Sequence, residues 1–198
     1  MKKFRVAIKA NEMFPFYMQH RMDDTKLDEW EKKRGHIIER DDVAHEDTVR
    51  AEFHSYRNGN GYYIPSAHVM GALINAGKYI KGKVGNSTKT MTNIVAAMFF
   101  VRSTEKNPEE LPLAPQEYQI DKRSAVNKNV KARVISVRPK WEGWATEFEL
   151  WIDNNTITQQ TVKQIVEYAG NYVGIGSYRP EHKGPFGRFT IEKFEEIR

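Results

Sequence analysis

Residues 146–170, TEFELWIDNNTITQQTVKQIVEYAG, change their hydrophobic period in the middle of the segment. From 146 to 152 apolar and polar side chains alternate, which is typical of a β-strand with one buried face. Over residues 162–169 apolar side chains recur at spacings of three and four, as on an amphipathic helix, with Thr158 among the N-cap candidates and Gly170 as a stop. A strand followed closely by a helix predicts a fold that mixes both elements.

Similar patterns occur elsewhere in the chain. Residues 4–10, FRVAIKA, alternate in the same way and predict a first strand. Residues 67–80 carry an apolar helical face behind Ser66, which is a candidate N-cap. The other expected elements are a hairpin over 49–64 with its turn at 58–61, a basic loop over 82–92, a buried strand over 93–103, an irregular connection over 104–120, a hairpin pairing 129–138 with 146–152, and a last strand over 187–194.

This order of elements predicts an α+β fold. Two helices dispersed among antiparallel hairpins favour a ferredoxin-like (RRM-type) antiparallel sheet with both helices on one face. The segment at about 11–47 contains charge runs and only a weak helical pattern, so it is interpreted as an inserted projection. The whole chain, 1–198, is then a single domain, and its length is sufficient to bury a substantial core.

The composition excludes several kinds of site. The chain has no cysteine, which excludes disulfides, thiolate metal sites, iron–sulfur clusters and cysteine nucleophiles. Its six histidines show neither His-x-x-x-His nor Glu-x-x-His spacing, so we expect no metal and no cofactor. No apolar run approaches the ~18–20 residues of a membrane helix, so we expect a cytoplasmic protein without a membrane partner.

The charge is unevenly distributed along the chain. The formal net charge is +5, but residues 23–47 hold ten acidic and five basic side chains. The remainder of the chain therefore carries an excess of ten positive charges. A surface of that sign attracts polyanions through phosphate contacts and counterion release.

Three catalytic or nucleotide-binding motifs are present only in part. Residues 77–84, GKYIKGKV, resemble a Walker A loop, but they end in Val84 where Ser or Thr should bind magnesium, and they follow a helix. The Gly-Ile-Gly at 174–176 lacks the third glycine of a dinucleotide fingerprint. Ser177 is not part of a Gly-x-Ser-x-Gly motif. An NTPase, a Rossmann protein and a serine hydrolase are therefore not expected.

Two basic segments are candidates for nucleic-acid binding. Residues 122–140 contain seven basic side chains and no acidic one. Residues 174–189, GIGSYRPEHKGPFGRF, combine glycines that allow close approach, cations for phosphates and aromatic rings for base stacking. The selected residues are Arg123, Lys128, Lys131, Arg133, Arg179, Lys183 and Arg188 for phosphate, Gly174, Gly176, Gly184 and Gly187 for close approach, Tyr178 and Phe186 for stacking, and Ser66 and His68 for polar contacts at a helix start.

Three segments together resemble the RAMP superfamily of CRISPR-associated proteins, especially the subunits that form the backbone along the guide RNA. They are IPSAHVMGALINAGK at 64–78, QIDKRSAVNKNVKARVISVRP at 119–139, and FELWIDNN…VGIGSYRPEHKGPFGRFTI within 148–191. The resemblance implies a subunit that grips guide or other single-stranded RNA by its phosphates, assembles with copies of itself along the RNA, and joins other subunits of a CRISPR complex. The 11–47 segment would correspond to the family's thumb or finger.

Two alternatives remain open at this point. One is a metal-independent endoribonuclease of the RAMP type that processes guide precursors, with His54, His68 or His182 as acid or base beside Tyr or Lys. The other is a phage or mobile-element protein that uses the same fold to bind single-stranded nucleic acid. Target-cleaving relatives use an aspartate of a projecting loop, for which this chain offers Asp23, Asp24, Asp28, Asp41, Asp42 and Asp47.

Overall fold

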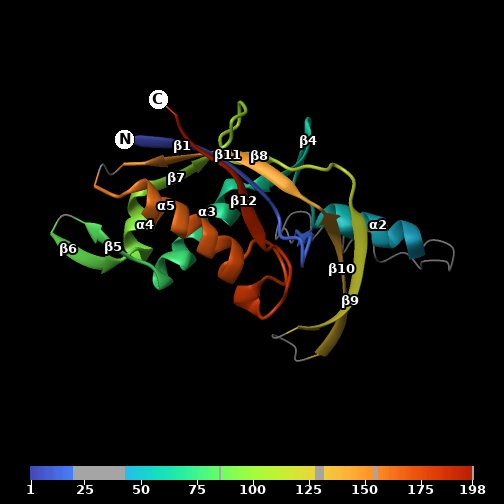
Figure 1. Cartoon of the computed structure of the whole chain (residues 1–198). Coiled ribbons are helices and arrows are strands. Elements are labelled where there is room, and N and C mark those ends of the chain that lie inside the picture. The colour runs from blue at the N-terminus through green and yellow to red at the C-terminus, as the bar shows by residue number, and fades with distance from the viewer. Residues whose placement is uncertain (20–42, 85, 128–131, 154–155, 198) are drawn as a thin grey trace.

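The centre of the fold is a four-stranded sheet with the order β12-β1-β11-β7 (Figure 1). The computed structural model describes residues 1–19, 43–84, 86–127, 132–153 and 156–197. Within them every strand pairing is antiparallel, and the expected α+β class is confirmed. The sheet consists of β1 (Lys2–Ala10), β7 (Phe99–Arg102), β11 (Ala145–Ile152) and β12 (Phe189–Ile197).

Alternation along the strands creates the core. In β1 the side chains of Phe4, Val6 and Ile8 are fully buried, and the register places Val6 opposite Phe148 of β11. Two helices, α3 (Ser66–Ala76) and α5 (Gln159–Tyr168), cover this face of the sheet (Figure 1). None of the described helices is long and apolar enough to cross a membrane.

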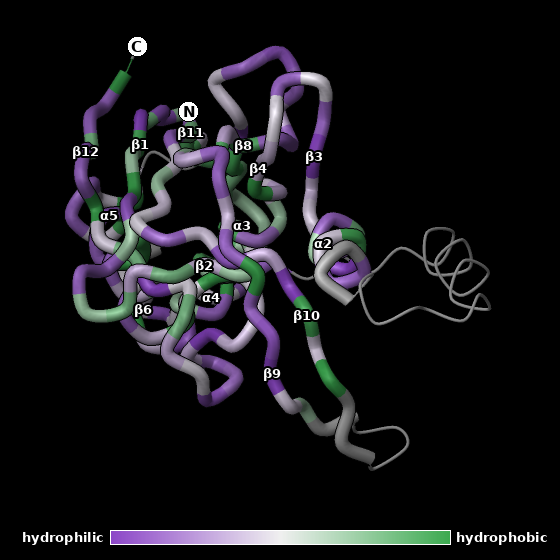
Figure 2. The backbone as a smooth tube through the Cα atoms, turned by 90° about the vertical axis from the view of Figure 1, so that its right-hand side faces the viewer, coloured by the Kyte–Doolittle hydropathy of each residue, from purple (hydrophilic) through white to green (hydrophobic). Residues whose placement is uncertain are grey.

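Smaller sheets flank the central one. A three-stranded sheet has the order β2-β10-β9, with bounds Phe16–Met18, Ala132–Glu142 and Gln119–Asn127. Figure 2 shows β9 and β10 running together away from the central sheet, with α2 (Val43–Phe53) beside them. The remaining elements are β3 (Arg57–Asn58), β4 (Gly61–Pro65) and β8 (Glu110–Pro112) in one sheet, the hairpin β5 (Lys81–Val84) and β6 (Ser87–Thr90), α4 (Thr92–Met98), and short helical turns at Gly77–Tyr79, Ala169–Val173 and Pro180–His182.

Two segments that were predicted as strands contain helices. The turn at 58–61 is present, but the chain before it forms α2, where Ala51 is fully buried and Glu46 pairs with Arg50 one helical turn away. The apolar run over 93–103 belongs mostly to α4, and only its end forms β7. A continuous apolar run has no periodicity that separates a buried helix from a buried strand.

The predicted hairpin between 129–138 and 146–152 is wrong. The two strands follow each other in the chain, but β10 pairs with β9 and β2, whereas β11 pairs with β1 and β7. Between them Gly143 adopts a positive φ of 61°, and Trp141 and Trp144 are both fully buried. The chain passes from one sheet to the other at this turn, between the two buried rings.

Other boundaries also differ from the prediction. Thr158 does cap α5, since its Oγ1 accepts a hydrogen bond from the amide of Thr161 at 3.1 Å. The helical chain nevertheless continues past Gly170 to Val173. Ser66 is not an N-cap, because Pro65 takes that position and α3 has no side-chain cap. The loop expected over 82–92 contains the β5–β6 hairpin, and the 104–120 connection contains β8.

The predicted projection at 11–47 lies largely outside the described residues. Its first part contains β2, and its end forms the start of α2. Of the six aspartates considered above, only Asp47 is described, and its carboxylate lies 2.7 Å from the amine of Lys122.

Candidate functional site

A cavity of about 500 Å³ lies where α3, β10 and the glycine-rich loop 174–189 meet. α3 contributes its first two turns, from Ala67 to Ala72, and β10 contributes Arg138. The loop contributes the consecutive residues 174–179. The polar and ionisable side chains of the lining come from His68, Arg138, Ser177, Tyr178, Arg179 and His182.

The glycines of the loop are explained by contacts within the chain. Gly187 has a φ of +69°, and a Cβ at this position would lie 1.8 Å from the carbonyl oxygen of Ile175. A Cβ on Gly176 would lie 2.3 Å from the carbonyl oxygen of Met18 at the end of β2. Gly174 and Gly184 are similarly crowded, by Pro180 and Tyr178 respectively. The loop therefore folds tightly on itself and on β2, and only Gly174 and Gly176 of the four line the cavity.

The two aromatic rings of the loop have different environments. Tyr178 is 45% exposed, adopts a positive φ of 55° and lines the cavity. Phe186 is only 6% exposed and packs against Phe16 of β2. This burial conflicts with the expected base-stacking role of Phe186, whereas the ring of Tyr178 remains accessible. The guanidinium of Arg123 covers both rings, 4.7 Å from the centre of Phe186 and 5.6 Å from that of Tyr178.

One face of the β9–β10 ribbon gathers three cations around one carboxylate. Asp121 is 8% exposed and accepts two hydrogen bonds from the guanidinium of Arg123, at 2.5 and 2.8 Å. The amine of Lys140 lies 3.9 Å from the same carboxylate, and Arg138 is its cross-strand partner. Lys122 belongs to the opposite face, where it pairs with Asp47. Glu142 also lies on the face of Lys140, so this side of the ribbon holds three cations and two carboxylates.

Arg138 is the least satisfied of these cations. Its Nε is buried and has no hydrogen-bond partner among the described residues. Burial lowers the pKa of the guanidinium, while nearby Asp121 acts in the opposite direction. A guanidinium remains charged at neutral pH even so, and a buried donor without a partner favours an incoming acceptor.

Arg179 is the second cation in the cavity. Its Nη1 donates to the carbonyl of Gly176 at 3.0 Å, and its Nε and Nη2 donate to Glu181. Arg138 and Arg179 both line the cavity, whereas no Asp or Glu of the described residues does. This leaves an excess of positive charge over negative charge around the cavity.

His68 is neutral at physiological pH. Burial, and secondarily the charge of Arg179, lowers its pKa to about 4. Its Nδ1 lies 3.3 Å from the hydroxyl of the buried Tyr17, and the ring of Tyr56 contacts it edge-on. These contacts fix the orientation of the imidazole at the wall of the cavity.

The pKa of His68 predicts acid-sensitive folding. Between pH 6.5 and about 4 the unfolded chain binds a proton at this histidine that the folded chain does not, so the free energy of unfolding falls as the pH falls. The loss is roughly 2–3 kcal/mol over this window. Urea unfolding at a series of pH values should show that His68→Gln flattens the profile between pH 4 and 6.5. Identical slopes for both proteins would contradict the assignment.

The other described residues selected from the sequence do not line the cavity. The backbone amide of Ser66 donates a hydrogen bond to the carbonyl of Glu109, so this amide is not available to a ligand. Lys183 is exposed with a left-handed backbone, and Arg188 donates to the carbonyl of Asn171. The backbone of Arg133 pairs with Val126 in the ribbon. Lys128 and Lys131 lie outside the described residues.

The structure adds Arg138 to the residues selected from the sequence. Arg138 belongs to the basic run 122–140, and Asp121 immediately precedes that run in the sequence. The signal that singles it out is its cross-strand position beside Asp121, which depends on the register of β9 and β10. The described residues contain no group of three or more His, Asp or Glu side chains that could hold a metal ion.

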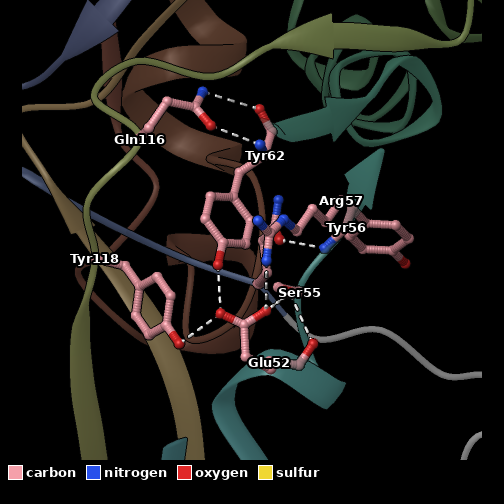
Figure 3. Close-up of polar contacts among 8 residues, drawn as sticks. Glu52, Ser55, Tyr56, Arg57, Tyr62, Gln116 and Tyr118 are labelled. Atoms are coloured by element: carbon pink, nitrogen blue, oxygen red, sulfur yellow. Dashed lines mark hydrogen bonds and ion pairs between the residues drawn. The ribbon is translucent and has the colours of Figure 1, made fainter. Parts of the chain in front are cut away.

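A second polar cluster joins α2 to the neighbouring sheets (Figure 3). The carboxylate of Glu52 accepts hydrogen bonds from the hydroxyl of Tyr62 and, at 2.8 Å, from that of Tyr118. The guanidinium of Arg57 lies 4.0 Å from the other carboxylate oxygen. Burial and the carboxylate raise the pKa of Tyr62 to about 12, so both tyrosines remain hydroxyl donors at neutral pH. This cluster has a structural role because its groups satisfy one another.

Removing the carboxylate of Glu52 should destabilise this junction. Glu52→Ala deprives two hydroxyl groups and Arg57 of their acceptor, at a cost of about 2 kcal/mol. For a chain of this length the melting temperature should fall by about 4–8 °C. Glu52→Gln keeps an acceptor oxygen and should lose less than half as much. Calorimetry that found the two variants equally stable would contradict this role.

No protein-family model matches this chain, and no curated protein is recognisably similar to it in sequence. The function is therefore argued from the geometry and charge of the site.

Proposed function

We propose that the protein binds single-stranded RNA by its phosphate backbone, as a RAMP-type subunit. The cavity receives a phosphate between Arg138 and Arg179, and Tyr178 stacks on an adjacent base. Arg123 and Lys140 on the β9–β10 ribbon contact further phosphates of the same RNA strand. Recognition of this kind is independent of sequence, because phosphate contacts position a nucleic acid without reading its bases.

The observation that carries the proposal is that Arg138 and Arg179 line one cavity to which no Asp or Glu of the described residues contributes. Two guanidinium groups at one cavity favour a bound anion such as phosphate. The exposed ring of Tyr178 at the same cavity favours a nucleotide over a free inorganic anion.

The strand order supports the fold that this proposal requires. We propose a ferredoxin-like arrangement for the central sheet, in which β1, β7, β11 and β12 are its first to fourth strands. The order β12-β1-β11-β7 is then 4-1-3-2, with α3 between the first and second strands and α5 between the third and fourth. The smaller sheets are additions to this unit. Assembly along guide RNA, within a CRISPR complex, follows only from the sequence resemblance and belongs to the same proposal.

Purification from the expression host tests the proposal. The chain is purified with and without nuclease treatment, and the 260/280 nm absorbance ratio, the mass distribution and the length of bound RNA are recorded. We expect co-purified RNA, and high-mass assemblies that collapse after RNase treatment. A nucleic-acid-free monomer that also fails to bind labelled single-stranded RNA at low salt would exclude the proposed function. Labelled single-stranded DNA of the same sequence shows whether the 2′-hydroxyl matters.

A second candidate, metal-independent RNA cleavage, is favoured by one observation. His68 and His182 both line the cavity beside the two arginines. Such a pair could transfer protons to and from the 2′-oxygen and the leaving oxygen of an RNA strand. Incubation of labelled RNA with chelator distinguishes the two functions. Cleavage that is lost in both His68→Gln and His182→Gln would favour the enzyme, and intact, tightly bound RNA would favour the binding subunit.

A further inference from the structure

Three tyrosines form an exposed row near the C-terminal end of α3, whereas the cavity is lined by earlier residues of that helix. Tyr79 follows α3, and Tyr168 and Tyr172 lie at the end of α5 and in the turn after it. Tyr79 is 64% exposed and Tyr172 is 60% exposed. The ring of Tyr172 lies 5.0 Å from that of Tyr168 and 6.4 Å from that of Tyr79, measured between centroids. The row therefore exists only in the folded protein, where two segments distant in sequence bring their tyrosine rings together.

The charge next to the tyrosine row is positive. Lys78 precedes Tyr79, and the β5–β6 hairpin that begins two residues later carries Lys81, Lys83 and Lys89, all exposed. The chain contains no Asp or Glu between Glu52 and Glu105. Glu167, the acidic neighbour of Tyr168, lines a separate groove between α5 and β12. The partner suited to this surface is therefore a polyanion that also offers flat rings.

We propose that the tyrosine row, Tyr79, Tyr168 and Tyr172, is a second contact surface for single-stranded nucleic acid, where bases stack on the rings and the lysines of 78–89 attract the backbone. This inference rests on the proposed function and extends it. Aromatic rings beside a basic segment are the means by which proteins bind single strands without reading sequence. α3 lines the cavity only as far as Ala72, and Tyr79 lies past the C-terminal end of α3, so the row extends the bound strand past the cavity.

Replacing the two most exposed rings tests the inference. The double variant Tyr79→Ala, Tyr172→Ala should bind labelled single-stranded RNA at least ~25-fold more weakly, because each lost stacking contact reduces affinity by about fivefold or more. The slope of log K against log salt should remain unchanged, because no charge is removed. The double variant Tyr79→Phe, Tyr172→Phe should bind like the wild type. Phe100→Ala removes a ring on β7 that is 49% exposed and serves as the control.

The outcomes separate this inference from the proposed function. If the wild type binds RNA and the double alanine variant binds equally well, the inference is wrong and the proposed function stands. If the double alanine variant instead lowers the oligomeric state without changing RNA affinity, the row is an interface between copies of the chain. If the wild type binds no single strand at low salt, both proposals fail. Circular dichroism of each variant verifies that these exposed substitutions leave the fold intact.

Discussion

Replacing Arg138 with glutamate should weaken RNA binding by at least ~100-fold. The change removes a charge-assisted phosphate contact, which contributes about 1.5–3 kcal/mol, and adds a carboxylate that repels the phosphate. The affinity is measured by fluorescence anisotropy with a labelled single-stranded RNA. Lys106→Glu makes the same change of charge at an exposed position in the loop between β7 and β8, and it should alter the affinity less than about threefold.

A second, milder substitution at position 138 separates loss of RNA binding from misfolding. Glutamate at position 138 would lie beside Asp121, so the substitution can disturb the ribbon itself. Arg138→Gln removes the charge without adding a repulsion, and it should reduce affinity about tenfold with an unchanged melting temperature. Wild-type affinity in a folded Arg138→Gln variant would show that the cavity does not hold the phosphate.

Replacing Gly187 with alanine should destabilise the fold strongly. The new Cβ would overlap the carbonyl oxygen of Ile175, and the residue would be held at a φ of +69°. Together the overlap and the left-handed backbone should cost about 3–5 kcal/mol. The melting temperature, measured by calorimetry, should therefore fall by about 10 °C or more.

Gly59→Ala is the matched control for this experiment. Its Cβ would meet nothing within 4 Å, and the change should shift the melting temperature by about 2 °C at most. If Gly187→Ala were as stable as the wild type but lost RNA affinity, this glycine would serve the close approach of a ligand rather than the packing of the loop.

Local patterns predicted the central elements well. The alternation of Phe4, Val6 and Ile8 matches β1, and the helical spacing from Val162 to Val166 together with the cap at Thr158 matches α5. These patterns suffice because one face of each element is buried in the core. The prediction of a strand where α4 lies was wrong because all faces of that segment are largely apolar. The predicted partner of β10 was wrong because strand pairing is decided by contacts between residues distant in sequence.

The candidate site was predictable in part. Of the residues selected from the sequence, Tyr178, Arg179 and His68 line one cavity, while their role in RNA binding stays a prediction. The sequence could not separate Tyr178 from Phe186, since only the packing against Phe16 buries the second ring. It could not select Arg138 either, because the register of the ribbon places that residue beside Asp121.

The most direct test of the central claim is the affinity of the wild-type chain for a labelled single-stranded RNA, measured across a series of salt concentrations. The account predicts tight binding at about 50 mM salt, with log K falling linearly against log salt at a slope of about −2 to −3 for three to four phosphate contacts. Absence of binding at that salt concentration, or an affinity that does not respond to salt, would contradict it.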